Sequence, residues 1–115
     1  MKALNDAKSI READKQMLLD VKRAIMELVP GADLLLYGST ARGERSSESD
    51  YDILVLTDGM LAASYQDVLR GVVYDIALDH DVVISLVFVS KDHWQLPSVC
   101  VTPFHRNVES EGITL

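Results

Sequence analysis

The sequence predicts an α/β (α+β) fold in which helices cover a small mixed β-sheet. Apolar residues recur at helical spacing over the first thirty residues and again from Met60 to about Leu78. Between and after these helices, short apolar runs predict buried strands at residues 33–37, 51–56 and 82–89. With 115 residues the chain can bury one core but not two, so residues 1–115 are expected to form a single domain.

Each predicted helix has one apolar stripe. The first helix ends at the pair Pro30-Gly31, and its stripe consists of Ile10, Met17, Val21, Ile25 and Leu28. Gly71 is an unfavourable residue inside the second helix. The stripe of that helix consists of Leu61, Tyr65, Val68, Leu69, Val72, Val73 and Ile76.

The tail from residue 90 to residue 115 gives weaker signals. The stretch "KDHW" predicts at most one helical turn. Pro97 and Pro103 favour irregular chain, and residues 113–115 are a candidate edge strand.

Composition excludes several classes of function. The net charge of −7 argues against general nucleic-acid binding, which needs Lys and Arg to neutralise phosphates. A divalent cation would still allow a small phosphorylated ligand to bind. No apolar run is long enough to cross a membrane, and the N-terminus lacks the pattern of a secretory signal. Cys100 is the single cysteine, so we expect no internal disulfide, a cytoplasmic location and a half-buried apolar role for this side chain.

Two predicted strands are joined by a long polar connection in residues 34–56, "LLLYGSTARGERSSESDYDILVL". A hairpin needs only about two to five connecting residues. At its end, Asp50 and Asp52 alternate with Tyr51 and Ile53. In a strand the two carboxylates therefore share one face, and the apolar side chains point to the core. Neighbouring carboxylates repel unless a cation lies between them, and Mg²⁺ takes such oxygen ligands. Asp50 and Asp52 are candidate Mg²⁺ ligands.

The connection begins with Gly38-Ser39. Glycine lets the backbone approach a ligand closely, and Ser39 is a good N-cap for a short helix that runs through Ala41. A helix N-terminus presents unpaired N–H groups, which suit phosphate. Gly38 and Ser39 are thus candidate nucleotide-binding residues that face the metal ligands. The alternative is a Gly/Ser loop followed by solvated aspartates.

The segment "YGSTARGERSSESDYDILV" resembles the signature of the DNA polymerase β-like nucleotidyltransferase superfamily. The short chain is similar to the minimal nucleotidyltransferases (MNT), its single-domain members. The resemblance implies that Gly38 and Ser39 grip a nucleoside triphosphate and that Asp50 and Asp52 bind Mg²⁺. It also implies transfer of a nucleotidyl group, commonly AMP from ATP, to an acceptor hydroxyl. Arg42 and Arg45 lie in the same segment. Arg42 is a candidate phosphate-binding residue, and Arg45 is a weaker candidate.

Active members of this family have a third carboxylate on the strand beside the one that carries the two aspartates. In residues 81–89, "DVVISLVFV", alternation places Asp81, Val83, Ser85 and Val87 on one face. Ser85 lies where a ligand would be expected, and Asp81 lies about 13 Å before it along an ideal strand. Either Asp81 acts from the start of the strand or the site is incomplete. Asp79 is a further candidate.

Three functions follow from the resemblance. Minimal members are often paired with a helical HEPN-domain protein, in some cases an RNase toxin that they AMPylate. An antitoxin of this type is the first hypothesis, and a catalytically impaired nucleotide- or partner-binding module is the second. The third is a drug-modifying transferase that acts as a homodimer through its N-terminal helix.

Other residues with functional chemistry are assigned structural roles. His80, His93 and His105 show no metal-ligand spacing and are expected at the surface or at helix ends. Trp94 is expected to be a packing anchor and Tyr37 a core residue.

Overall fold

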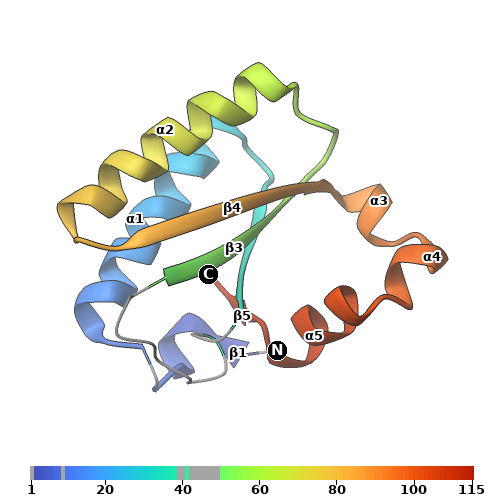
Figure 1. The fold of residues 1–115 in the computed structure, drawn as a ribbon, viewed down its shortest axis with the longest axis horizontal. Helices are drawn as coiled ribbons and strands as arrows, with labels where there is room; N and C mark the ends of the chain where they lie inside the picture. The colour runs from blue at the N-terminus through green and yellow to red at the C-terminus, as the bar shows by residue number, and fades with distance from the viewer. Residues whose placement is uncertain (1, 9, 39–40, 42–49) are drawn as a thin grey trace.

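The computed structural model describes residues 2–8, 10–38, 41 and 50–115, and in this part of the chain five strands form one mixed sheet (Figure 1). The order across the sheet is β1-β5-β2-β3-β4. The strands are β1 (Lys2–Ala3), β2 (Asp33–Tyr37), β3 (Asp50–Thr57), β4 (Val83–Ser90) and β5 (Ile113–Thr114).

The register of the central strands places the polar residues of the sheet side by side. β2 is antiparallel to β3, with Tyr37 opposite Asp52. β3 is parallel to β4, with Asp50 beside Val83 and Asp52 beside Ser85. At the other side of the sheet, β5 is antiparallel to β2 and parallel to β1, so the two chain ends lie close together (Figure 1).

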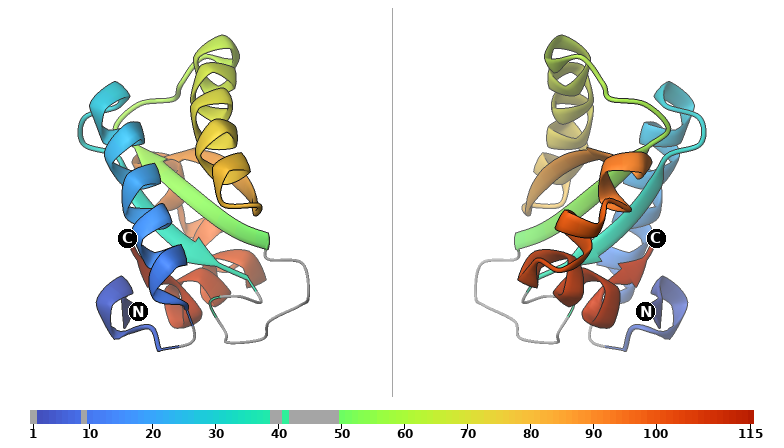
Figure 2. Two further views of the ribbon diagram at one scale, coloured as in Figure 1. Left: turned by 90° about the vertical axis from the view of Figure 1, so that its left-hand side faces the viewer. Right: turned by 90° about the vertical axis from the view of Figure 1, so that its right-hand side faces the viewer.

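Helices cover both faces of the sheet (Figure 2). The two long helices, α1 (Glu12–Leu28) and α2 (Ala63–Asp79), pack on one face. The opposite face carries the three short helices α3 (Lys91–Trp94), α4 (Pro97–Cys100) and α5 (Pro103–Glu111). A short 3₁₀ helix, η1 (Leu4–Asp6), precedes α1. None of the described helices combines the length and apolar character that crossing a membrane requires.

Alternation along β3 divides its side chains between two cores. Tyr51, Ile53 and Val55 are buried against α1 and α2, as the strand pattern predicted. Leu54 and Leu56 point to the other face and pack on Trp94 and the C-terminal helices. Asp50 and Asp52 share this second face, at the start of β3.

The predicted long helices and central strands are confirmed, but their details need correction. The first helix begins only at Glu12, because residues 2–6 form β1 and η1. Ile10 precedes that helix and is still buried. Leu28 and Val68 were assigned to apolar stripes and are exposed, because Leu28 is the last residue of α1 and Val68 lies at the margin of the buried face of α2. The buried residues of α2 are Leu69, Val73 and Ala77.

The tail is more regular than predicted. Pro97 and Pro103 were expected to favour irregular chain, yet each is the first residue of a helix. Proline suits that position because the first N–H of a helix has no partner and the ring fixes a helical φ. The predicted strand at residues 113–115 forms as β5, but it is not an edge strand, since β1 pairs with its outer side.

Candidate functional site

Gly38 follows β2 directly and lies against Asp52. Its φ is +85°, a left-handed backbone conformation that residues other than glycine rarely adopt. A Cβ at this position would lie 2.7 Å from Oδ2 of Asp52. The end of β2 therefore brings bare backbone against the carboxylate, and the close approach of Gly38 to a ligand stays a prediction.

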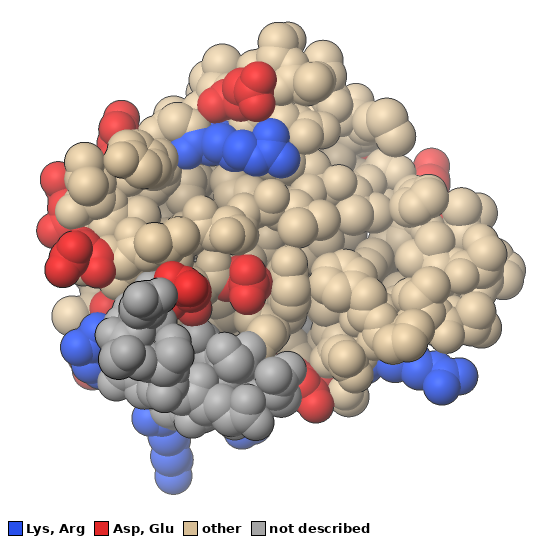
Figure 3. Space-filling model, viewed as in Figure 1, with Lys and Arg blue, Asp and Glu red and all other residues tan. Residues whose placement is uncertain are grey.

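Asp50 and Asp52 extend from the start of β3 on the face of the sheet that α1 and α2 do not cover. Asp50 is exposed and Asp52 is half-buried. Burial raises the pKa of the Asp52 carboxyl, and the charge of Asp50 raises it further. Figure 3 shows acidic side chains exposed near this end of β3. A carboxylate whose ionisation is opposed by burial and by a neighbouring carboxylate forms a site that a hard cation would stabilise.

Tyr37 lies beside this acidic pair, opposite Asp52 in the β2–β3 register. Its ring packs edge-on against Phe104 of α5, with 5.1 Å between the ring centroids. Burial, and after it the charge of Asp52, raises the pKa of the Tyr37 hydroxyl. The prediction that Tyr37 is a core residue is only partly right, because it is half-buried at the margin of the smaller core.

Ser85 stands directly beside Asp52 on β4, as the strand alternation predicted. Asp81 lies outside β4, in the turn after α2, with a φ of 55°. Asp79 is the last residue of α2. Among residues 2–8, 10–38, 41 and 50–115, no three His, Cys, Asp or Glu side chains gather closely enough to hold a metal ion. The structure therefore brings Asp50 and Asp52 together, and it leaves Asp79 and Asp81 out of such a group.

Several predicted site residues lie outside the part of the chain that the structure describes. These are Ser39, Arg42 and Arg45, together with most of the short helix expected through Ala41.

The residue between the two aspartates makes a contact that sequence reasoning missed. Tyr51 donates a hydrogen bond from Oη to the buried Oδ2 of Asp14, on α1. Arg11 donates to the same oxygen from Nε at 3.3 Å and from Nη2 at 3.2 Å. The available signal was that Asp14 occupies the apolar stripe, between Ile10 and Met17. This contact ties the acidic end of β3 to the start of α1.

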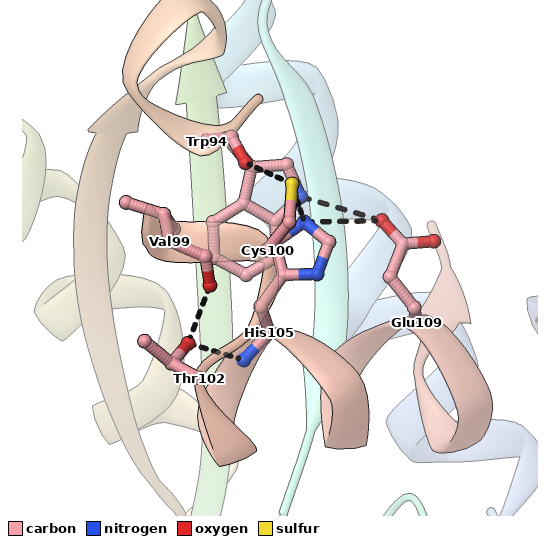
Figure 4. A network of polar contacts seen from close by, with 6 residues as sticks. All are labelled: Trp94, Val99, Cys100, Thr102, His105 and Glu109. Atoms are coloured by element: carbon pink, nitrogen blue, oxygen red, sulfur yellow. Dashed lines mark hydrogen bonds and ion pairs between the residues drawn. The ribbon is translucent and has the colours of Figure 1, made fainter. Parts of the chain in front are cut away.

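The C-terminal helices contain a second cluster of polar side chains, shown in Figure 4. Cys100 Sγ lies 3.6 Å from His105 Nε2, and Glu109 Oε1 lies 3.9 Å from the same nitrogen. In a catalytic relay the nucleophile and the orienting acid contact different nitrogens of the histidine. In this cluster both contact Nε2, so the arrangement is not a relay.

This cluster stabilises the C-terminal helices instead. The imidazole of His105 stacks on Trp94 at 4.3 Å, and Thr102 Oγ1 accepts a hydrogen bond from the His105 N–H as the N-cap of α5. The roles predicted for Trp94 and Cys100 are confirmed, since Trp94 is buried and Cys100 is half-buried. His105 lies in the first turn of α5 but is buried against Trp94 and not at the surface. His80 and His93 are exposed, as predicted.

The chain belongs to the nucleotidyltransferase domain family, which it matches over residues 18–111. This range includes β2, Gly38, the two aspartates and β4. The predicted nucleotidyltransferase class and fold are thereby confirmed. None of the curated proteins matches the chain.

Two solved structures are similar in fold. One is a toxin–antitoxin crystal structure with AMP-PNP, with a TM-score of 0.58 and 21% identity over 86% of this chain and 69% of the other. The other contains a tri-AMPylated HEPN toxin from Shewanella oneidensis in complex with an MNT antitoxin. Its TM-score is 0.50, with 20% identity over 85% of this chain and 70% of the other.

Proposed function

We propose that this chain transfers AMP from ATP to a hydroxyl group of a partner protein and acts as the antitoxin to a HEPN-domain toxin. The observation that carries the proposal is the approach of the Gly38 backbone to Asp52, beside Asp50, in a chain of the nucleotidyltransferase family. The similarity in fold to two toxin–antitoxin structures supports the choice of partner. One of those structures holds an ATP analogue and the other an AMPylated toxin, which supports the choice of nucleotide. A reaction that consumes ATP is consistent with a cytoplasmic location.

The two carboxylates fit a magnesium ion. Both are oxygen ligands on one face, Asp50 is exposed, and the charge of Asp50 adds to burial in raising the pKa of Asp52, an effect that a bound cation would offset. Asp50 and Asp52 would hold Mg²⁺, which when bound neutralises the triphosphate and lowers the pKa of the attacking hydroxyl. In this proposal Ser39 and Arg42 bind phosphate beside Gly38.

Asp81 is our candidate for the group that accepts the proton of the attacking hydroxyl. It precedes Val83, the residue beside Asp50, and so lies toward the Asp50 end of the site. Asp81 would act as a base and not as a metal ligand.

A second candidate function is a module that binds nucleotide or partner without transfer. The position of Ser85 beside Asp52 favours it, because a neutral hydroxyl lacks the negative charge of a carboxylate and is a far weaker base. The module would neutralise its partner by contact alone.

Purification with the protein encoded by the neighbouring gene tests the proposal. With ATP and Mg²⁺, the partner should gain the mass of one or more adenylyl groups, and the Asp52→Asn variant should bind the partner without modifying it. Binding of ATP and partner with no gain in mass would favour the binding module. Absence of ATP binding would contradict the transferase, and absence of both ATP binding and partner binding would contradict both functions.

Nucleotide binding alone has a separate readout. ATP with Mg²⁺ should raise the melting temperature, since ligand at a hundredfold excess over Kd stabilises a protein by about 2.7 kcal/mol. ATP with EDTA should raise it much less. Equal shifts with and without metal would contradict the assignment of Asp50 and Asp52.

A further inference from the structure

The outer edge of β4 lacks the features that usually protect an edge strand. β4 is the last strand of the sheet in the described part of the chain, and no backbone hydrogen bond joins its outer side to another described element. Edge strands usually carry Lys, Pro or inward-pointing charges that prevent pairing with another chain. The eight residues of β4, "VISLVFVS", include none of these. Val83 and Val87 lie on the same face of β4 as Ser85, and their side chains are 59% and 37% exposed.

The neighbouring face of α2 is exposed and carries both apolar and charged side chains. Its side chains Val68, Tyr74 and Leu78 are 53%, 64% and 62% exposed. Between α2 and β4 lies a groove that Arg70, Gly71, Tyr74 and Asp75 line on the helix and residues 84–86 line on the strand. Figure 3 shows uncharged side chains along β4, with basic and acidic side chains at the margins of this surface.

Nothing among the described residues requires a glycine at position 71. A Cβ at this position would meet no atom within 4 Å, and its φ is not positive. Glycine destabilises the interior of a helix relative to alanine. Its place in the groove leaves room for a side chain from another molecule.

We propose that two copies of this chain associate about a two-fold axis, with their β4 strands antiparallel and their α2 helices side by side. A two-fold interface requires a patch that complements itself. An axis that passes beside Ser85, at the centre of the groove on β4, pairs Val83 of each copy with Val87 of the other. The two exposed valines then cover each other as cross-strand neighbours.

The same axis makes α2 complementary to its symmetry mate. The groove residues of α2 centre between positions 72 and 73, so an antiparallel helix places Arg70 opposite Asp75 of the second copy. Asp75 makes no ion pair with any described residue of its own chain. Arg70 has an exposed contact to Asp67 at 3.5 Å, and its guanidinium lies over the ring of Phe88 on β4, 5.1 Å from the centroid. Gly71 then faces the second Tyr74, whose ring would occupy the open space beside the glycine. Apolar pairs, opposite charges and a large side chain against a glycine are thus all reciprocal.

Sedimentation equilibrium of the purified chain, without partner or nucleotide, tests the proposal. The wild type should form a concentration-dependent dimer, and a variant with Val83→Lys and Val87→Lys should be monomeric. Val101→Lys is the matched control, because Val101 is 65% exposed at the end of α4 and belongs to neither element. Thermal melts identify any variant that fails to fold.

Charge reversal gives a second test that does not depend on β4. Arg70→Asp and Asp75→Arg should each weaken dimerisation by about tenfold or more, because each places like charges opposite one another. The double variant should restore the wild-type dissociation constant to within about threefold, since it exchanges the two charges. Failure of the double variant to restore dimerisation would overturn the proposed register.

Two further outcomes would overturn the proposal as a whole. One is a wild type that stays monomeric at all concentrations. The other is a chain that is monomeric and binds its partner protein through this face. In that case the variant with Val83→Lys and Val87→Lys would lose the complex with the partner, and no homodimer would exist to be lost. None of these results depends on whether the chain transfers nucleotides.

Discussion

Gly38 and Asp52 are fixed against each other by the antiparallel pairing of β2 and β3, so that a Cβ on Gly38 would lie 2.7 Å from Asp52 Oδ2. The contact joins the proposed phosphate-binding backbone to the proposed metal ligand. Glycine at this position therefore suits the fold through its positive φ, and in the proposed site its missing side chain would leave the backbone open to a phosphate.

The Gly38→Ala variant should lose stability and nucleotide binding together. The positive φ and the close carboxylate both oppose a side chain, so we expect the free energy of unfolding to fall by about 1–3 kcal/mol. Gly59→Ala is the matched control, because a Cβ at Gly59 meets no atom within 4 Å and should change stability by no more than about 0.5 kcal/mol. Urea denaturation measures both variants. Equal stability of the two would contradict the strain assigned to Gly38.

The raised pKa of Asp52 predicts the pH dependence of stability without metal. Between the ordinary pKa of 3.8 and the raised value, the folded chain holds a proton that the unfolded chain has lost. The free energy of unfolding therefore falls as pH rises through this window and stays lower above it. Asp52→Asn should remove this fall, so at neutral pH the variant should be at least as stable as the wild type. Melting temperatures from pH 3.5 to 7, set in steps of about half a unit, measure the difference.

Mg²⁺ binding should show the opposite trend. The ion competes with the proton on Asp52, so its affinity for the wild type should rise as pH increases through the same window. Isothermal titration in the presence of ATP measures this affinity, and Asp52→Asn should abolish the metal-dependent part. A variant that unfolds instead would show that Asp52 has a structural role.

Removing the Tyr51 hydroxyl should loosen the acidic end of β3. Tyr51→Phe keeps the buried ring and takes one hydrogen-bond donor from the Asp14 carboxylate. We expect a loss of about 1–3 kcal/mol, because the bond is buried and its acceptor is a carboxylate. Tyr65→Phe removes an exposed hydroxyl that donates to the Leu28 carbonyl and should cost about 0.5 kcal/mol.

A double-mutant cycle with Asp14→Asn separates this contact from other effects of each substitution. The cycle should give a coupling energy of about 1 kcal/mol or more between Tyr51 and Asp14. Additive effects would show that the two side chains do not stabilise each other. Mg²⁺-dependent ATP binding by Tyr51→Phe reports whether the contact also fixes the spacing of Asp50 and Asp52.

The sequence predicted β3 well because a period of two determines which side chains share a face. Asp50 and Asp52 therefore had to separate from Tyr51 and Ile53, and the structure agrees. Pro97 and Pro103 misled the prediction of the tail, because proline interrupts a helix in its interior but favours the first position. The location of β5 depends on pairing with residues 2–3 at the far end of the chain, and no local pattern encodes that contact.

The missed contact of Asp14 has the same kind of cause. A carboxylate in an apolar stripe needs a partner, and Tyr51 lies 37 residues away in sequence. The third carboxylate was difficult for another reason. Alternation placed Asp81 on the face of Ser85, but the chain enters a left-handed turn at Asp81 before β4 begins.

Asp81→Asn tests whether Asp81 acts as the base for the attacking hydroxyl. Asparagine tolerates the left-handed conformation at this position as well as aspartate does, so the variant should fold normally. We expect transfer to the partner to fall by about a hundredfold or more, the usual contribution of a general base, while Mg²⁺-dependent ATP binding stays unchanged. Asp79→Asn, at the end of α2, is the matched control, and loss of transfer there would move the role to Asp79. If Asp81→Asn transfers normally, Asp81 is not the base.

The Ser85→Asp variant is the informative change if the wild type is silent with its natural partner. It adds a carboxylate beside Asp52, and a gain of transfer would identify Ser85 as the position that disables the site.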